Sequence, residues 1–170
     1  MRKLKLFSLF LCLFVGLGQM WGAKITSVSN IQSGKKYYIG ATKSNSTDYY
    51  LSVADHGASA ATGKQGSAVT NKTDAEVFTF TKSGDNWSIQ FESGNYLSLA
   101  SSKANGKVDV VASAANWAIT NSSNLLQLKI NNYCLKCNSQ TNTANFGSYS
   151  SGQLNVWLEE VPGGSSDPTV

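Results

Sequence analysis

The sequence has few residues of the kinds that bind metals. It holds one histidine, His56, and three cysteines, of which Cys12 lies in an apolar N-terminal run. Cys134 and Cys137 are the only cysteines in the rest of the chain. A zinc site needs further ligands beside such a pair, and His56 is distant from it in sequence. The sequence therefore predicts no metal site and no cofactor.

The two remaining cysteines are also poorly spaced for a disulfide. Residues three positions apart on an extended strand lie about 10 Å apart, whereas a bridge tolerates about 7 Å between Cα atoms. We therefore expect no bond between Cys134 and Cys137, with Cys137 in the core and Cys134 more accessible. Inhibitor domains that present rigid, bridged loops are disfavoured for the same lack of cysteine.

Charge is scarce and nearly balanced. Charged residues make up 14% of the sequence, and without Arg2, Lys3 and Lys5 eleven basic residues stand against ten acidic ones. The lysines are scattered one or two at a time, so no basic patch for a phosphate backbone is evident. The sequence predicts that nucleic acid is not a partner. Low charge with abundant Ser, Thr, Asn and Gly is typical of a secreted β-rich domain.

Motifs for catalysis are missing as well. The chain contains no Gly-x-Ser-x-Gly segment, and its acidic residues are scattered singly except for Glu159 and Glu160. A catalytic role for His56 would need a nucleophile and an orienting group, which the sequence alone does not place. We therefore expect His56 to be a solvated loop residue and the protein not to be an enzyme.

The one long apolar run lies at the N-terminus. Residues 6–17 are uncharged and follow Arg2, Lys3 and Lys5. The run is shorter than the roughly 20 residues of a membrane-spanning helix and is followed by small residues, as in a cleaved secretory signal. We predict a signal peptide over residues 1–23, no stable membrane anchor, and a protein secreted to the extracellular space or the periplasm.

An internal repeat organises the remaining sequence. The stretch 95–101, Asn-Tyr-Leu-Ser-Leu-Ala-Ser, recurs in altered form around Leu51 and Leu135, and the central leucines Leu51, Leu97 and Leu135 are 46 and 38 residues apart. Spacing of this kind indicates repeated structural units. We expect these three leucines to be buried at equivalent positions.

A second series of positions repeats in the same order. Apolar residues alternate in the triplets 78–80, 117–119 and 156–158, which are spaced by 39 residues at each step. Since the outer residues of a triplet on a strand share one face, we expect Phe80, Ile119 and Leu158 to be buried too.

Turn residues separate the strand-like segments, and no stretch shows sustained helical periodicity. Residues 54–66, with three glycines, are expected to form a long loop. The predicted strands are residues 37–42, 49–53, 67–70, 77–82, 87–91, 96–100, 108–112, 117–120, 125–130, 134–138, 144–149 and 154–161.

Twelve short strands in three related sets of four resemble the β-trefoil fold, and in particular the ricin-type lectin-like modules of secreted bacterial proteins. The resemblance covers residues 35–161 and implies an all-β domain over residues 24–161, in which six strands close a barrel and six form a hairpin triplet that caps it. The alternative is an immunoglobulin-like sandwich of about seven strands, which gives no reason for a threefold repeat. Residues 162–170 are expected to form a linker or disordered tail.

The same resemblance implies sugar binding by stacking on exposed aromatic side chains. If the repeated leucines point inward, Tyr50 and Tyr96 point outward at equivalent positions. Tyr38 and Trp157 point outward by the same alternation, and Tyr149 is a further candidate. The alternative for each tyrosine is half-buried packing between hairpins.

The Gln-x-Trp signature of ricin-type lectins is absent, and residues 153–157 approach it with the wrong spacing. The sequence thus predicts a monomeric, non-catalytic module that binds a glycan or an extracellular polysaccharide. Two alternatives stay open, a protein-interaction or inhibitor module and an accessory domain appended to a secreted enzyme.

Overall fold

The computed structural model describes residues 22–57, 61–138 and 144–165. It is all-β, as the sequence predicted, with two single-turn 3₁₀ helices, η1 (Val28–Asn30) and η2 (Lys72–Asp74). The strands are β1 (Lys24–Ile25), β2 (Lys35–Thr42), β3 (Asp48–Val53), β4 (Ala61–Val69), β5 (Phe78–Ser83), β6 (Asn86–Phe91), β7 (Tyr96–Ser98), β8 (Lys107–Val111), β9 (Ala118–Ser122), β10 (Leu125–Ile130), β11 (Tyr133–Cys137), β12 (Asn145–Tyr149) and β13 (Trp157–Ser165).

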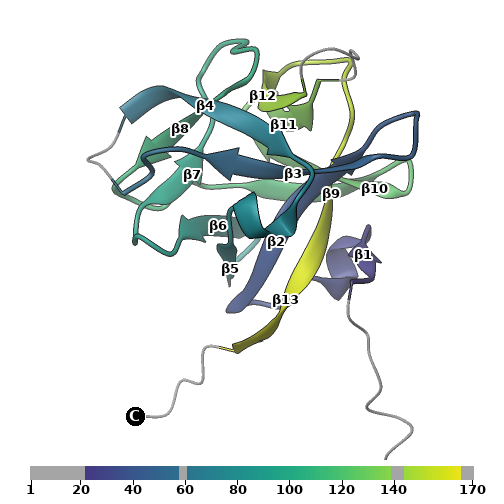
Figure 1. Cartoon of the computed structure of the whole chain (residues 1–170). Coiled ribbons are helices and arrows are strands. Elements are labelled where there is room, and N and C mark those ends of the chain that lie inside the picture. The colour runs from purple at the N-terminus through teal and green to yellow at the C-terminus, as the bar shows by residue number, and fades with distance from the viewer. Residues whose placement is uncertain (1–21, 58–60, 139–143, 166–170) are drawn as a thin grey trace, which may run out of the picture.

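All strands belong to one antiparallel sheet that closes on itself. The ladders run from β2 through β5, β6, β7, β8, β4 and β3 back to β2, which makes a closed barrel of seven strands. Strand β13 extends this sheet beside β2 and carries β1, while β12, β11, β10 and β9 continue from β4. Figure 1 shows β2 and β13 side by side, with the end of β13 at the bottom of the view.

The predicted ricin-type β-trefoil is corrected by this topology. The resemblance implied a barrel closed by six strands, whereas the ladders close a ring of seven. Strands β6 and β9 meet only near the single bridge Trp87–Trp117, and β10 meets the segment before β13 at the single bridge Leu126–Val156. The alternation of apolar residues sets which face of a strand is buried, but it does not determine which strands close the sheet.

The repeated leucines occupy matching positions in three hairpins. Leu51 lies opposite Ala68 in the β3–β4 pair, Leu97 opposite Val110 in the β7–β8 pair, and Leu135 opposite Ser148 in the β11–β12 pair. All three leucines are buried, as predicted, and so are the triplet residues Phe80, Ile119 and Leu158.

Large aromatic side chains fill much of the core. Trp117, Phe78, Phe80, Phe91 and Phe146 are all buried in one cluster with the repeated leucines. Each lies on or next to a short alternating strand, so the face that it shares with its i+2 neighbour is removed from water. Burial of this apolar surface is the main term that stabilises the fold.

Two strands run further than the sequence predicted. Strand β4 begins at Ala61, inside the predicted loop 54–66, and β13 continues beyond Val161 to Ser165. Pairing between β4 and β8 shifts register between Ala61 and Lys64, where Gly63 has a φ of 67°. This irregularity explains why alternation failed to reveal the start of β4. Residues 1–21, most of the predicted signal peptide, and residues 166–170 lie outside the described residues.

The described part of the chain contains no helix that is long and apolar enough to cross a membrane.

Both cysteines of the domain are free and buried. Cys134 is the more exposed of the two, as predicted, but the difference is small, 4% against 0% for Cys137. Strand β11 pairs with β10 on one edge and β12 on the other, and its burial pattern leaves little of either face open. Burial raises the pKa of Cys134, and it raises the pKa of Cys137 to about 11.

We expect both thiols to react slowly while the protein is folded. A pKa raised to about 11 lowers the thiolate fraction of Cys137 at pH 8 by about 100-fold relative to an ordinary cysteine. Alkylation by iodoacetamide, followed by mass spectrometry, should modify both residues quickly in denaturant and neither quickly without it. Rapid modification of Cys134 in the folded protein would contradict its burial.

Leu97→Ala should lower the free energy of unfolding by about 2–5 kcal/mol, because Leu97 is fully buried and its truncation leaves a cavity. Urea denaturation measures the loss. Ser98→Ala, the next residue on β7 and only half-buried, is the matched control and should cost less than about 0.5 kcal/mol. Equal effects of the two substitutions would show that the core assignment is wrong.

Candidate ligand-binding site

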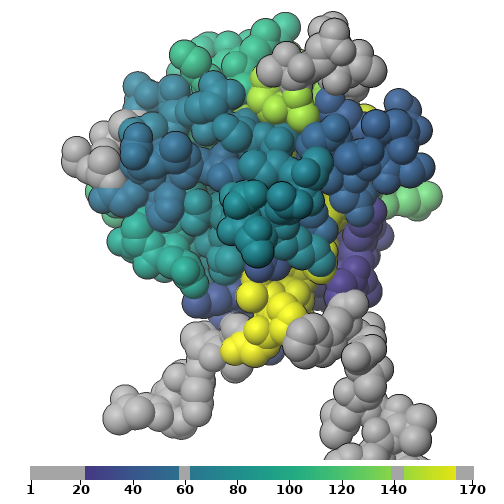
Figure 2. All heavy atoms as spheres, viewed as in Figure 1, coloured from purple at the N-terminus to yellow at the C-terminus, as the bar shows by residue number. Residues whose placement is uncertain are grey.

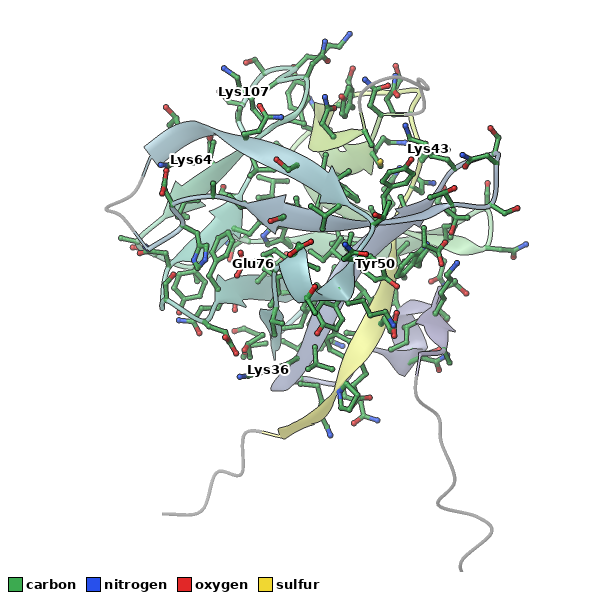
Figure 3. The ribbon with its side chains drawn as sticks, viewed as in Figure 1. Lys36, Lys43, Tyr50, Lys64, Glu76 and Lys107 are labelled. Carbon is green, nitrogen blue, oxygen red and sulfur yellow. The ribbon has the colours of Figure 1, made fainter. Side chains whose placement is uncertain are left out.

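Three of the five aromatic residues proposed from the sequence lie together. Tyr38 is on β2, Tyr50 on β3 and Trp157 at the start of β13. They meet because Gly40 of β2 pairs with Tyr50 on one edge and with Trp157 on the other. The ring centroids of Tyr50 and Trp157 are 5.3 Å apart and those of Tyr38 and Tyr50 5.9 Å, both edge to face. We call these three residues the aromatic cluster, and Tyr50 is labelled in Figure 3.

Two members of the aromatic cluster are not available for stacking on a ligand. Tyr50 is 6% exposed and Trp157 1%, whereas Tyr38 is half-buried. Neither Tyr50 nor Trp157 belongs to the main core, so alternation placed them correctly on the other face of their strands. The expectation of exposure was wrong because charged side chains cover that face. The Lys24 ammonium lies 4.8 Å from the Trp157 ring centroid.

The other two predicted residues lie elsewhere. Tyr149 is buried on β12, where its hydroxyl donates to the Asn145 side chain, and burial raises its pKa. Tyr96 is half-buried on β7. Strands β7 and β12 do not pair with β2, β3 or β13. The structure therefore does not bring Tyr96 or Tyr149 to the aromatic cluster.

Glu159 is the functional candidate that sequence reasoning missed. Its side chain is 7% exposed, Oε1 forms an ion pair with Lys72 of η2, and Oε2 accepts a 3.1 Å hydrogen bond from the Tyr50 hydroxyl. Its neighbour Glu160 points the other way, to Lys35 at 3.2 Å. The sequence did contain one indication of its role. Glu159 lies two residues after Trp157, so both side chains are on one face of β13.

The Tyr50 hydroxyl is held in its protonated form. Burial raises the pKa of Tyr50, and the negative charge of Glu159 raises it further. A neutral phenol beside a carboxylate can only donate to it, so the hydrogen bond fixes the direction of the Glu159 side chain. The Lys72 ammonium also lies 5.6 Å from the Tyr50 ring centroid, in cation–π geometry.

The indole of Trp157 is held by a second charged group, the carboxylate of Asp48, through the hydroxyl of Thr42. Its Nε1 donates to Thr42 Oγ1 at 2.9 Å, and that hydroxyl donates to Asp48 at 2.7 Å. Lys24 forms a 2.6 Å ion pair with the same Asp48 oxygen. Burial opposes ionisation of Asp48, but the hydrogen bonds from Lys24 and Thr42 outweigh it and lower its pKa.

A surface pocket opens beside the aromatic cluster. It has a volume of about 240 Å³ and is lined by Gly22, Tyr38, Lys72, Glu159 and Pro162. We call it the Tyr38 pocket. Ligand sites commonly measure about 300–1,000 Å³, so this one suits a single small group such as one sugar ring or a head group. In Figure 2 the yellow atoms of β13 lie directly below the teal atoms around η2, the two elements that supply Glu159 and Lys72.

A wider and more open hollow of about 450 Å³ lies at the start of β2, next to β5 and β6. Its lining comprises Lys36, Thr79, Gln90, Phe91, Glu92 and Gly94, and Lys36 pairs with Glu92 at 2.8 Å. The charged pair is exposed to solvent, so it is held less firmly than Glu159. Among the described residues, no group of three or more His, Cys, Asp or Glu side chains could hold a metal ion.

Comparison with known proteins supports the fold and not the ricin-type resemblance. No protein-family model and no curated protein matches the chain. A salivary protein from Culex, of the cysteine and tryptophan-rich family, aligns with a TM-score of 0.57 and 18% identity over 79% of this chain and 99% of its own.

Lysenin gives two further matches. Its pore aligns with a TM-score of 0.51 and 16% identity over 84% of this chain, and its complex with phosphocholine with the same score and identity over 81%. The chain spans about half the length of lysenin, 50% and 47% in the two structures. None of these three structures is a ricin-type lectin, so the resemblance to that family is withdrawn.

We expect Gly40→Ala to disrupt the aromatic cluster, because a Cβ atom at Gly40 would overlap the indole ring of Trp157. Overpacking of this kind costs about 1–3 kcal/mol. Urea denaturation and the near-ultraviolet circular dichroism of the aromatic residues measure the effect. Gly57→Ala is the control, since its Cβ would meet only the Ser93 Cβ at an ordinary 3.8 Å. A Gly40→Ala protein as stable as Gly57→Ala would contradict the described packing.

Proposed function

We propose that the protein is a secreted binding module that holds one small neutral glycan unit in the Tyr38 pocket. Sugar sites combine an aromatic face, on which the apolar side of the ring stacks, with charged or amide groups that hydrogen-bond to its hydroxyls. Tyr38 supplies the half-buried aromatic wall, Glu159 the acceptor and Lys72 the donor. The predicted leader at residues 1–23 supports secretion to the extracellular space or the periplasm.

The observation that carries the proposal is the buried carboxylate of Glu159 in an open pocket. Burying a charge is costly unless it is paired and hydrogen-bonded. Both oxygens of Glu159 are engaged by groups from other elements, Lys72 of η2 and Tyr50 of β3, and yet the residue lines the pocket. Such an arrangement holds an acceptor in a fixed orientation, which lowers the entropy that a ligand loses on binding.

The proposed site differs from the one expected from the sequence. Tyr50 donates a hydrogen bond to Glu159 and does not touch the ligand. The proposal therefore drops the idea of two sites on separate repeats, one at Tyr50 and one at Tyr96. A single pocket of about 240 Å³ gives a small contact area and hence modest affinity. The proposal retains a monomer that binds a glycan or an extracellular polysaccharide, without nucleic acid and without a membrane anchor.

A second candidate ligand is a quaternary ammonium head group. The Lys72 ammonium lies over the Tyr50 ring and against Glu159, and a choline group is recognised by the same combination of aromatic faces and negative charge. One of the lysenin structures is a complex with phosphocholine. A choline group would occupy the position that Lys72 now fills, so Lys72 would have to move outward into solvent.

The two ligands are distinguished by one substitution. Binding should be measured by calorimetry on the chain without residues 1–23, first with sugars chosen from a glycan array and then with phosphocholine. Tyr38→Ala should weaken the binding of either ligand by about 10-fold, since stacking on an aromatic side chain contributes about 1–3 kcal/mol. Lys72→Ala should weaken the binding of a glycan, because a hydrogen-bond donor is lost. The same substitution should strengthen the binding of phosphocholine, because Lys72 no longer occupies the position of the choline group.

Tyr96→Ala is the matched control and should leave binding unchanged. If Tyr38→Ala has no effect in a protein that stays folded, the site assignment fails. If neither ligand class binds, the protein-interaction alternative takes first place. The remaining alternative, an accessory domain of a secreted enzyme, would then be tested by identifying the enzyme with which it associates.

A further inference from the structure

Three side chains far apart in sequence meet on a different surface from the Tyr38 pocket. His56 lies in the turn after β3, Glu76 in the segment between η2 and β5, and Ser93 in the turn between β6 and β7. His56 Nδ1 is 3.0 Å from Ser93 Oγ, and His56 Nε2 is 3.3 Å from Glu76 Oε2. The structure thus supplies the nucleophile and the orienting group that the sequence could not place for His56.

The imidazole is held in one orientation. It stacks on the buried Phe91 ring with centroids 4.9 Å apart and planes 9° from parallel. The backbone carbonyl of His56 accepts a hydrogen bond from Asn95 Nδ2 at 2.8 Å, and it lies 3.2 Å from Ser93 Oγ, where it competes with Nδ1 for the single hydroxyl proton. The turn that carries Ser93 is closed by Phe91 and Asn95, whose backbones bond at 2.8 Å. Stacking and backbone hydrogen bonds together keep Nδ1 directed at Ser93 Oγ.

The hydrogen-bond network assigns the protons of the imidazole. Glu76, whose side chain is 14% exposed, can accept a hydrogen bond from Nε2–H. The other nitrogen, Nδ1, is then left as an acceptor. It receives the Ser93 hydroxyl proton when that proton turns from the His56 carbonyl to the imidazole, which is the arrangement a general base requires. Ser93 itself is exposed and open to solvent, so a substrate can reach its Oγ.

We propose that Ser93 is a nucleophile that accepts an acyl group from carboxylic esters with a good leaving group, with His56 as its general base. Ser93 Oγ attacks the ester carbonyl carbon while its proton passes to His56 Nδ1. The carbon–oxygen bond to the leaving group breaks, and the protonated imidazole returns that proton to the departing alcohol. Water then attacks the acyl-serine with the same base, releases the carboxylic acid and restores the Ser93 hydroxyl. Glu76 acts as a positioning residue through His56.

A hollow that could receive the ester lies next to Ser93 in the chain, although neither Ser93 nor His56 is among its lining residues. The hollow of about 450 Å³ is lined by the residues on either side of Ser93, Glu92 and Gly94, together with Phe91 and Gln90. General-base assistance of this kind contributes about 10²–10⁴-fold to a reaction rate. The expected activity is therefore acylation of Ser93 followed by slow turnover. It is independent of the Tyr38 pocket.

The test uses the folded chain and p-nitrophenyl acetate. We expect a burst of about one p-nitrophenol per chain, and peptide mapping should place the acetyl group on Ser93. Ser93→Ala and His56→Gln should each lower the burst rate by at least about 10-fold. Ser83→Ala, an exposed serine on β5, is the matched control and should leave the rate unchanged. Tyr38→Ala should also leave it unchanged, which separates this proposal from glycan binding.

The role of Glu76 needs a readout that a merely structural residue would not affect. Glu76→Gln removes the negative charge that favours the protonated imidazole, so the pH profile of acylation should move towards lower pH. Thermal unfolding of each variant checks that it is folded, and Ser93→Cys, which keeps a nucleophile, should restore the burst. Acetylation of lysine with Ser93 unmodified, or a Ser93→Ala protein that reacts as fast as the parent, would overturn the proposal.

Discussion

Backbone pairing along both edges of β2 is the constraint on which the rest of the structure depends. One edge of β2 pairs first with β5 and then with β3, and the other edge pairs with β13. The first two contacts close the seven-stranded ring, and the third attaches the last strand of the chain to it. Long-range pairing of this kind leaves the seven-stranded ring without a free edge, and it also brings Tyr38, Tyr50 and Trp157 together.

The face of β2 and β13 that carries the aromatic cluster forms a second layer outside the main core. Its side chains are buried not by another sheet but by lysines whose ammonium groups lie over the rings of Trp157 and Tyr50. Each lysine is also paired with a carboxylate, Asp48 or Glu159. Water can reach the rim of an apolar layer that is capped by ion pairs. This layer can therefore hold the charged Tyr38 pocket open to solvent, which the dry main core could not do.

Sequence periodicity predicted the buried residues better than it predicted the site. The recurring leucines and the triplet residues Phe80, Ile119 and Leu158 are buried because a period of two fixes which side of a strand faces the core. The same rule could not show that the outward side of Trp157 is covered, since Lys24 is more than a hundred residues away along the chain. Closure of the ring and the meeting of His56, Glu76 and Ser93 likewise depend on strand pairing, which no local pattern encodes.

Gly22, two residues before β1, forms part of the wall of the Tyr38 pocket. An added Cβ there would lie 3.3 Å from Glu159 Oε1. Cleavage before Lys24, at the end of the predicted leader, would remove Gly22 and leave the new amino terminus on β1, next to β13. The wall over Glu159 would then be missing, and the precursor and the processed protein would differ at this one opening.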